Sequence, residues 1–393
     1  MLQLLFPALL LLSSCTKEED ALPFKERGTI IATSEVGSLS KDEVVQRVTE
    51  LDAGPFSTYG VRYHVITYRS DYQGEGVDTK GLLILPVGVD SVPLIACFHG
   101  TQLPLDVPAT NNQIPSEYRG QADEDQFTMI RNMGLFWASA GYAVFMPDYV
   151  GFTSTSEKEH PYLYYPELFK ANIDGLLAAR SYLTQLGHPD DNRLFLSGWS
   201  QGGGACLSAH RFIQEQYSDR FTVVASSGLA GPYNVLRTIR SIFEAPGEEN
   251  EGLGIYSWGV YSMNKFSNVK RPTDQMWSYP VYDQISSVLT PSHKPEEVFI
   301  DYFLTGVTSG SDPQMVNLLK ENSFFEGWTP VGKVFLHHGD SDQLVPYFNS
   351  VDAYNGLTAA GGDVQLYTYP GGDHATELGN FSRTTLVDFN AQL

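Results

Sequence analysis

Short apolar runs bounded by turn residues recur along most of the chain, and they predict buried β-strands. The first run alternates apolar and polar positions, whereas the later runs are mostly apolar. Because the strands of a parallel sheet are covered on both faces, such continuous apolar runs favour a parallel arrangement. The predicted strands lie at residues 63–69, 82–85, 94–98, 143–146, 193–197, 221–226, 334–338 and 364–369.

Segments with helical spacing lie between several of these strands. At 125–140, Ile130 and Met133 recur near the helical period, and a glycine follows as a stop signal. Further helices are expected at 168–186 and 203–216. Strands that alternate with helices of this length predict βαβ units, and hence an α/β fold with a mostly parallel, doubly wound sheet.

The alternation stops after Gly231 and resumes at the strand expected near residue 334. Residues 232–328 are instead rich in aromatic residues and prolines. We interpret 232–328 as a mainly helical insertion that forms a cap or lid over one edge of the sheet. The core is then expected to span 40–231 and 329–393. The alternative is that the inserted segment continues the helices of the core with long loops.

The chain begins with a short apolar run at residues 4–12, which cannot cross a bilayer as a helix. Two serines precede Cys15, and a charged run follows at 17–20. This arrangement predicts a secretory signal peptide over residues 1–15. It also resembles the lipobox of bacterial lipoproteins, which implies a lipid on Cys15, although no Lys or Arg precedes the apolar run.

Residues 16–39 are mostly polar and irregular, and we expect them to form a tether. The acidic run after Cys15 is similar to the surface-export signal of some bacterial lipoproteins, and a disordered tether explains it equally well. The chain is therefore expected to be exported as a lipoprotein of the bacterial cell envelope. The outer membrane is the expected location, with display on the cell surface as a further option.

The charge balance narrows the range of partners. With 25 basic and 46 acidic residues, the formal net charge is −21. Nucleic-acid binding depends on Lys and Arg side chains that neutralise phosphates, so no nucleic-acid partner is expected. Direct adhesion to anionic lipid headgroups is disfavoured for the same reason. The aromatic content of 12% favours a surface or pocket that stacks on apolar or sugar-like ligands.

Cys97 lies in a predicted strand and Cys206 in a predicted helix, so both are expected to be buried thiols. No Cys-x-x-Cys pair or Cys/His cluster surrounds them, and the sequence therefore predicts no metal site. A disulfide between the two cysteines is the alternative for an exported protein.

A Gly-Trp-Ser-Gln-Gly run centred on Ser200 supplies the first candidate chemistry. It falls between a predicted strand and a predicted helix, which is the setting of a nucleophile elbow. The tight turn leaves no room for side chains at Gly198 and Gly202. Ser200 is thus the predicted nucleophile. The backbone N–H of Gln201, at the start of a helix, is predicted to be one oxyanion donor.

A serine hydroxyl is not nucleophilic at neutral pH and needs a base that a third group orients. In an elbow of this kind, the chain order is Ser, then Asp or Glu, then His. Asp340 and Asp342 both lie in the loop after the strand 334–338, and both are candidates for the acid. His374 is the last histidine of the chain and follows the last strand in a glycine-rich loop, so it is the predicted base.

The loop after the strand 94–98 supplies the second oxyanion donor in this arrangement. The backbone N–H of Thr101 is our candidate, with that of Gln102 as the alternative.

Other polar residues near strand ends are expected to have structural roles. His99 is expected to form structural hydrogen bonds, and Asp148 is expected to hold the loop that follows its strand. His337 and His338 flank a strand end and need no catalytic role. His160 is expected either to border the pocket or to form a turn.

Taken together, these residues resemble the α/β-hydrolase superfamily and, within it, the secretory lipases. The similarity runs in the expected order from about residue 60 to residue 390. It departs from the family pattern at 151–153, where relatives often carry a second glycine. The matching segments are Phe98-His99-Gly100-Thr101, Pro147 to Ser154, His160-Pro161-Tyr162, Gly198 to Gly203, His338 to Pro346, and Asp373-His374.

The resemblance implies hydrolysis of acyl esters with Asp342 as the acid, an inserted helical lid and no cofactor. We therefore expect an esterase or lipase that forms an acyl-enzyme on Ser200 from a small ester or an acylated polymer. Alternatives are a carbohydrate esterase that removes acetyl or feruloyl groups and a serine peptidase on the same fold. A non-catalytic surface binding protein is least favoured, because all three triad candidates are present.

Overall fold

The fold is built on one twisted sheet. The computed structural model describes residues 26–48, 51, 55–107, 114–121, 127–189 and 192–393. Within these residues, nine strands form the sheet in the order β1-β2-β3-β5-β4-β6-β7-β8-β9. Neighbours from β5 to β9 are parallel, whereas β1, β2, β3 and β5 pair antiparallel. The strands are β1 (Ile30–Leu39), β2 (Val61–Tyr72), β3 (Glu75–Pro86), β4 (Leu94–Phe98), β5 (Ala143–Pro147), β6 (Arg193–Trp199), β7 (Thr222–Leu229), β8 (Lys333–Gly339) and β9 (Val364–Tyr369).

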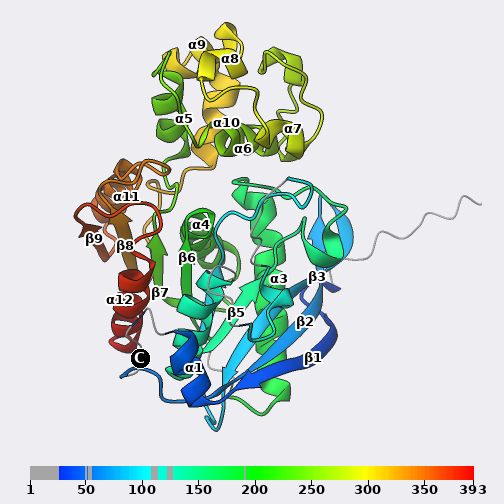
Figure 1. Cartoon of the computed structure of the whole chain (residues 1–393), viewed down its shortest axis with the longest axis vertical. Coiled ribbons are helices and arrows are strands. Elements are labelled where there is room, and N and C mark those ends of the chain that lie inside the picture. The colour runs from blue at the N-terminus through cyan, green and yellow to red at the C-terminus, as the bar shows by residue number, and fades with distance from the viewer. Residues whose placement is uncertain (1–25, 49–50, 52–54, 108–113, 122–126, 190–191) are drawn as a thin grey trace, which may run out of the picture.

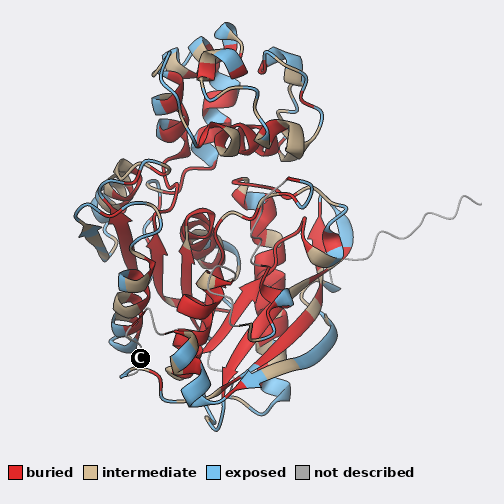
Figure 2. Ribbon diagram, in the orientation of Figure 1, coloured by how far each residue is buried: buried red, intermediate tan, exposed pale blue. Residues whose placement is uncertain are grey.

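Alternate residues of the strands face opposite sides of the sheet, and helices cover both sides (Figure 1). In β4, Leu94, Ala96 and Phe98 face one side, while Ile95 and Cys97 face the other. The central strands are buried along their whole length (Figure 2). This double covering confirms the doubly wound α/β fold. The first side carries α3 (Tyr165–Gln185), α4 (Gln201–Gln216) and α11 (Phe348–Ala359), and the second carries α1 (Lys41–Arg47), the π-helix η4 (Ile130–Leu135), α2 (Phe136–Ser139) and α12 (Leu378–Asn390).

The chain between β7 and β8 is helical, and its helices lie together beyond one end of the strands (Figure 1). Its aromatic residues pack against one another. The ring of Phe243, for example, lies 5.0 Å from that of Phe299 and 5.7 Å from that of Phe303. The helical character expected for residues 232–328 is therefore confirmed. The helices are α5 (Val235–Phe243), α6 (Leu253–Phe266), α7 (Gln284–Val288), α8 (Pro295–Val298), α9 (Asp301–Ser309) and α10 (Pro313–Glu321).

The structure corrects the expectation for the segment that precedes the core. Residues 16–39 are predicted to be a tether, but β1 occupies Ile30–Leu39 and pairs with β2, so the prediction is wrong for this part. β1 lies at the edge of the sheet and most of its side chains are exposed. Its sequence mixes polar and apolar residues, and its apolar run is only three residues long, Ile30-Ile31-Ala32. The predicted signal peptide and Cys15 lie outside the described residues.

Cys97 and Cys206 are buried free thiols, as expected, and they do not form a disulfide. Burial raises the pKa of both thiols, so neither is ionised at neutral pH.

Over the part of the chain that the structure describes, no helix is both long enough and apolar enough to cross a bilayer.

Helix α3 approaches the sheet most closely at Gly175. A Cβ atom at this position would lie 2.7 Å from the rings of Phe145 and Tyr68. Alanine improves helix propensity by about 1 kcal/mol, but overpacking a core contact costs about 1–3 kcal/mol. We therefore expect Gly175→Ala to lower the free energy of unfolding by about 1 kcal/mol in urea denaturation.

Gly379→Ala in α12 is the matched control. The nearest atom to its added Cβ would be a methyl group of Leu51, at 3.3 Å, which can move. This variant is expected to keep or slightly raise the free energy of unfolding. Similar changes in both variants would contradict the close packing inferred at Gly175.

Candidate active site

Ser200 lies at the turn between β6 and α4 in a strained backbone conformation. Its φ is +59° and its ψ is −123°, a region that L-residues rarely occupy. A Cβ atom at Gly198 would overlap the carbonyl group of Gly202, and one at Gly202 would overlap the carbonyl oxygen of Phe98. The steric need for both glycines is therefore confirmed.

The three residues of the predicted triad form a hydrogen-bonded series in which His374 lies between Ser200 and Asp342. The Ser200 hydroxyl lies 2.9 Å from Nε2 of His374, to which it can donate. Nδ1 of His374 donates in turn to Oδ2 of Asp342 at 2.8 Å. The carboxylate thereby selects the tautomer whose Nε2 lone pair faces the serine. This arrangement can activate a serine nucleophile with an imidazole base.

The Asp342 carboxylate is buried but well hydrogen-bonded. Oδ1 accepts from the backbone N–H groups of Leu344 and Val345, each at 2.9 Å, and Oδ2 accepts from both His338 and His374. Burial is the largest single effect and disfavours the charged form. The hydrogen bonds from the two histidines, the charge interaction with His374 and the backbone N–H of Val345 together outweigh it and hold the pKa of Asp342 below its ordinary value. Asp342 is therefore ionised at neutral pH, and it can stabilise an imidazolium.

Asp340, the competing candidate for the acid, contacts the next loop instead. Its Oδ1 accepts from the backbone N–H of Gly371 at 2.7 Å. This bond joins the loop after β8, which carries Asp342, to the loop after β9, which carries His374. Asp340 therefore helps to keep the two predicted triad residues together.

Sequence reasoning missed the contact between His338 and Asp342. Nε2 of His338 lies 3.2 Å from Oδ2 of Asp342 and 2.8 Å from the carbonyl oxygen of Val345. Because a carbonyl oxygen can only accept, Nε2 carries a proton, which is shared between these two acceptors. Nδ1 of the neutral ring then accepts from the hydroxyl of Ser350 at 2.7 Å. The four-residue spacing before Asp342 was the only sequence signal for this contact.

Gln201 and Thr101 line the same pocket as Ser200. Gln201 is the first residue of α4, so its backbone N–H is one of those that the helix leaves without an internal partner. Thr101 lies in the loop after β4. The structure thus brings both predicted oxyanion residues to the predicted nucleophile, and their role as donors stays a prediction. The other lining residues are Tyr162, Leu163, Pro232, Ile255, Tyr256, Leu344 and Val345.

His99 and Asp148 have the structural roles that the sequence predicts. The ring of His99 contacts the carbonyl oxygens of Gly100 and Asp148 at 2.8 and 3.2 Å, and burial lowers its pKa to about 4. The Asp148 carboxylate accepts from the backbone N–H and hydroxyl of Ser116 and from the hydroxyl of Thr153. Both residues therefore fix the loops that follow β4 and β5.

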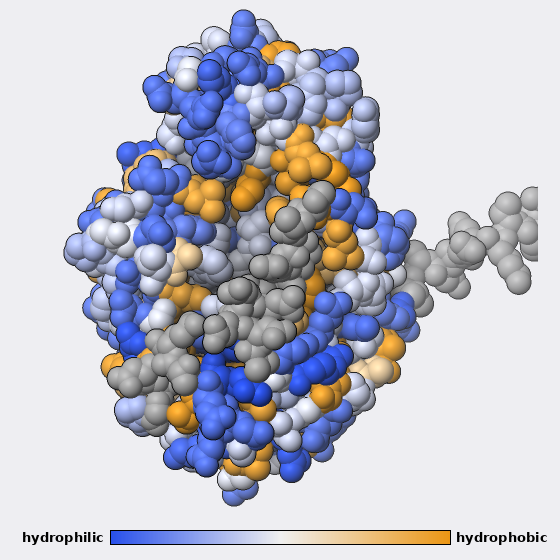
Figure 3. Space-filling view, in the orientation of Figure 1, coloured by the Kyte–Doolittle hydropathy of each residue, from blue (hydrophilic) through white to orange (hydrophobic). Residues whose placement is uncertain are grey.

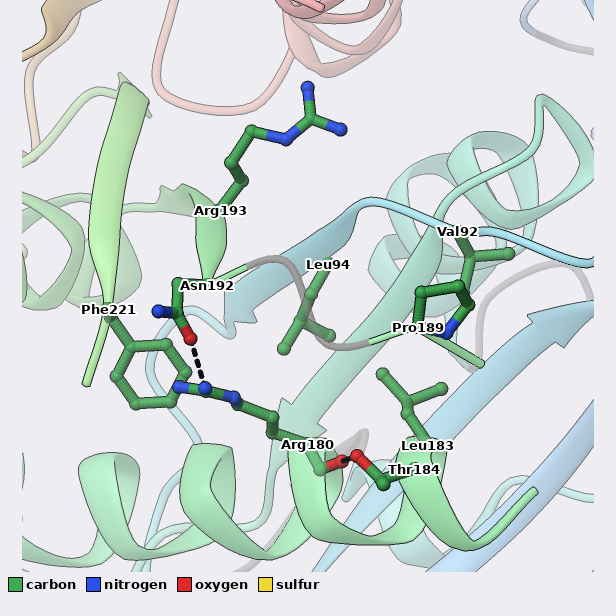
Figure 4. Close-up of a pocket in the computed structure, with 9 residues that line it drawn as sticks. All are labelled: Val92, Leu94, Arg180, Leu183, Thr184, Pro189, Asn192, Arg193 and Phe221. Atoms are coloured by element: carbon green, nitrogen blue, oxygen red, sulfur yellow. Dashed lines mark hydrogen bonds between the residues drawn. The ribbon is translucent and has the colours of Figure 1, made fainter. Parts of the chain in front are cut away.

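A second pocket lies at the opposite end of the central strands, and its described lining residues lack this chemistry (Figure 4). Leu94 and Arg193, which line it, are the first residues of β4 and β6, whereas Ser200 follows the last residue of β6. The Arg180 guanidinium occupies this pocket, over the ring of Phe221 at 5.2 Å. Among the described residues, no group of His, Cys, Asp and Glu is arranged to hold a metal ion.

The strain at Ser200 gives a test that does not depend on activity. Ser200→Gly and Ser200→Ala both remove the hydroxyl, but only glycine adopts this conformation freely. Relief of strain is worth about 1–3 kcal/mol, against an entropic cost of about 0.5–1 kcal/mol for glycine. We expect the glycine variant to be more stable to urea than the alanine variant by about 1 kcal/mol. Equal stability would show that the turn is relaxed.

Comparisons with known proteins identify hydrolases of similar sequence and fold. The model of the prolyl oligopeptidase family, Peptidase_S9, matches residues 129–276, which include the elbow. The secreted triacylglycerol lipase LIP2 of Malassezia furfur is 22% identical over 349 residues, which are 84% of this chain and 69% of that lipase.

Solved structures extend the similarity over the whole fold. A putative hydrolase from Legionella pneumophila superposes with a TM-score of 0.77 at 20% identity, over 92% of this chain and 98% of that one. The rice cell wall degrading esterase LipA from Xanthomonas oryzae superposes with a TM-score of 0.75 at 24% identity, over 93% of this chain and 98% of that one. The chain therefore has the α/β-hydrolase fold, and its sequence is similar to that of secreted lipases.

Proposed function

We propose that this chain hydrolyses carboxylic esters through a covalent acyl-enzyme on Ser200. The observation that carries the proposal is the continuous hydrogen-bonded series from the Ser200 hydroxyl through His374 to Asp342, at 2.9 and 2.8 Å. The pocket at Ser200 gives an ester carbonyl a place beside the nucleophile.

Each step of the proposed reaction uses a group already in place. His374 Nε2 takes the proton as Ser200 Oγ attacks the ester carbonyl, and Asp342 stabilises the resulting imidazolium. The backbone N–H groups of Gln201 and Thr101 would bind the tetrahedral oxyanion. His374 then gives its proton to the departing alcohol. Water attacks the acyl-enzyme in the same way and releases the acid.

The lining of the pocket favours an ester with a short acyl group. None of the described residues that line it carries a charge, and several are aromatic or aliphatic. The space at Ser200 is at most about 290 Å³, near the lower limit for ligand pockets. Apolar surface also gathers where the helical segment meets the core (Figure 3). A short apolar acyl chain fits these limits.

The match to the prolyl oligopeptidase family over residues 129–276 makes a peptidase the second candidate. A peptidase that grips the free amine of a short peptide needs a carboxylate in its pocket. Among the described residues that line the pocket at Ser200, none has an acidic side chain that could hold such an amine. Similarity to a secreted lipase also extends over 84% of the chain, well beyond the peptidase match. Ester cleavage is therefore the better-supported reaction.

The helical segment at 232–328 is proposed to act as a cap. Ile255 and Tyr256 of α6 form part of the pocket lining, and the Tyr256 hydroxyl donates to the carbonyl oxygen of Leu344. These contacts place α6 against the loop that carries Asp342. The segment would thus shape the space for the acyl or alcohol group.

A substrate series tests the reaction and its acyl preference. We expect p-nitrophenyl acetate and butyrate to be cleaved with higher kcat/KM than long-chain esters, because the pocket is small. Ser200→Ala should reduce turnover by about 10⁴-fold or more. Progress curves with the purified protein measure both effects, and circular dichroism checks that the variant is folded.

Peptide and polysaccharide substrates distinguish the esterase from the alternative functions. Faster cleavage of a short peptide than of any ester would establish the peptidase. A preference for acetylated or feruloylated polysaccharide would identify a carbohydrate esterase. No turnover of any ester by the wild-type protein, or unchanged turnover by Ser200→Ala, would refute the proposed function.

We further propose that Cys15 carries a lipid that anchors the chain to the bacterial envelope, at the outer membrane. The support is the apolar run at 4–12, which ends in small residues directly before the cysteine, and the polar segment after it. Export agrees with the relationship to secreted lipases.

Metabolic labelling tests this anchor. In a bacterial host fed an alkyne fatty acid, we expect the wild-type chain to be labelled and to sediment with membranes. Cys15→Ala should lose both properties. Cys97→Ala should keep both, because the buried Cys97 thiol is not a candidate for lipidation. Labelling that persists in Cys15→Ala, or that is absent from the wild type, would exclude the anchor.

A further inference from the structure

The segment His160-Pro161-Tyr162 lies beneath the pocket, in the loop between β5 and α3. Both the His160 and the Tyr162 side chains are buried, at 1% and 3% exposure. They lie on either side of a single proline, and they contact the two different residues that are predicted to bind the oxyanion.

His160 contacts Gln201. Its Nδ1 lies 2.8 Å from the carbonyl oxygen of Val150, which can only accept, so Nδ1 carries the ring proton. Nε2 is then an acceptor, and the Gln201 side-chain amide donates to it at 2.6 Å. Burial lowers the pKa of His160 to about 3, so the ring stays neutral and this polarity is kept at neutral pH.

Tyr162 contacts Thr101. The two hydroxyl oxygens lie 2.8 Å apart. The Tyr162 ring stacks on that of Trp258, with centroids 4.1 Å apart and planes 4° from parallel. Thr101 lies in a loop, outside the regular backbone hydrogen bonding of a helix or strand. The hydrogen bond to the Tyr162 hydroxyl therefore restrains the position of its side chain.

Helix α6 of the helical segment supports the whole arrangement. The Ser262 hydroxyl donates to the carbonyl oxygen of His160 and accepts from the backbone N–H of Tyr162, each at 3.1 Å. Trp258 and Ser262 are four residues apart, so they lie on one face of α6. The ion pair between Lys265 and Glu159, at 2.7 Å, joins the same helix to the start of the segment.

We propose that His160 and Tyr162 are positioning residues, which fix the side chains of Gln201 and Thr101 and so hold their backbone N–H groups where an ester oxyanion develops. This inference rests on the proposed function. An oxyanion donor is effective only within about 2.7–3.1 Å of the developing charge. A misplacement of about 1 Å can cost about a hundredfold in rate.

Two isosteric variants test the hydrogen bond between Tyr162 and Thr101. Tyr162→Phe and Thr101→Val each remove one hydroxyl and little volume. We expect each to lower kcat on p-nitrophenyl butyrate about tenfold, with KM changed less than twofold. The double variant should be no slower than either single variant, because both remove the same bond. Tyr72→Phe is the control, since it removes the hydroxyl bond to the carbonyl oxygen of Glu159, in the same loop, without touching an oxyanion residue.

A second pair of variants tests the hydrogen bond between His160 and Gln201. Glutamine at position 160 places its amide oxygen near the original Nε2 and can still accept from Gln201. Asparagine places its amide nitrogen near the original Nδ1 and keeps only the bond to Val150. Both variants lose the ring, and asparagine is smaller than glutamine by one methylene group, so the melting temperatures of both variants are compared as well. We expect His160→Gln to retain several-fold more kcat than His160→Asn.

A trifluoromethyl ketone separates positioning from general destabilisation. Its adduct with Ser200 places an oxyanion in the proposed hole. The inhibition constant of this ketone should therefore rise by the same factor as kcat falls, while the melting temperature of Tyr162→Phe stays near that of Tyr72→Phe.

Unchanged kcat in Tyr162→Phe and equal kcat in the two His160 variants would overturn the positioning role alone. An equal loss of kcat in Tyr72→Phe would also overturn it, because the effect would then belong to the loop in general. Absence of ester turnover by the wild type would overturn the proposed function, and this inference with it.

Discussion

The backbone at Ser200 is the constraint on which the rest of the site depends. Its left-handed φ is maintained because Gly202 contacts the carbonyl group of Phe98 at the end of β4, while Gly198 contacts Gly202 itself. The elbow is thus held against the neighbouring parallel strand. Strain of about 1–3 kcal/mol is small beside the stabilisation from strands that are buried on both faces. The same contact places the loop after β4, with Thr101, next to the nucleophile.

Asp342 is the second costly element, since an isolated charge in the protein interior is strongly unfavourable. Four hydrogen bonds compensate for its burial: two from backbone N–H groups and two from histidines. Because one of these donors is His374, the interaction that stabilises the carboxylate also orients the predicted base. The bond from His338, fixed in turn by Ser350, supports the carboxylate from the other side.

Much of this was predictable from sequence, because the buried strands and the elbow depend on local patterns. Ser200 and His374 could be named from the order of motifs along the chain, whereas Asp342 was preferred to Asp340 only through the resemblance to known hydrolases. β1 could not, since this edge strand has mostly exposed side chains and carries only a short apolar signal. The contacts of His338 and His160 were also hidden. Each depends on which way an imidazole points in a folded interior, and spacing along the chain does not determine that.

The helical segment at 232–328 contacts both the pocket at Ser200 and the residues that support it, which is more than a simple covering of the pocket would need. α6 supplies part of the pocket wall through Ile255 and Tyr256, and it supports the segment beneath the pocket through Trp258 and Ser262. A displacement of α6 would therefore change the wall of the pocket and the support of Tyr162 together. Part of the pocket wall and the support of Tyr162 therefore depend on the same helix. A substitution on that helix is thus expected to alter acyl preference and rate together.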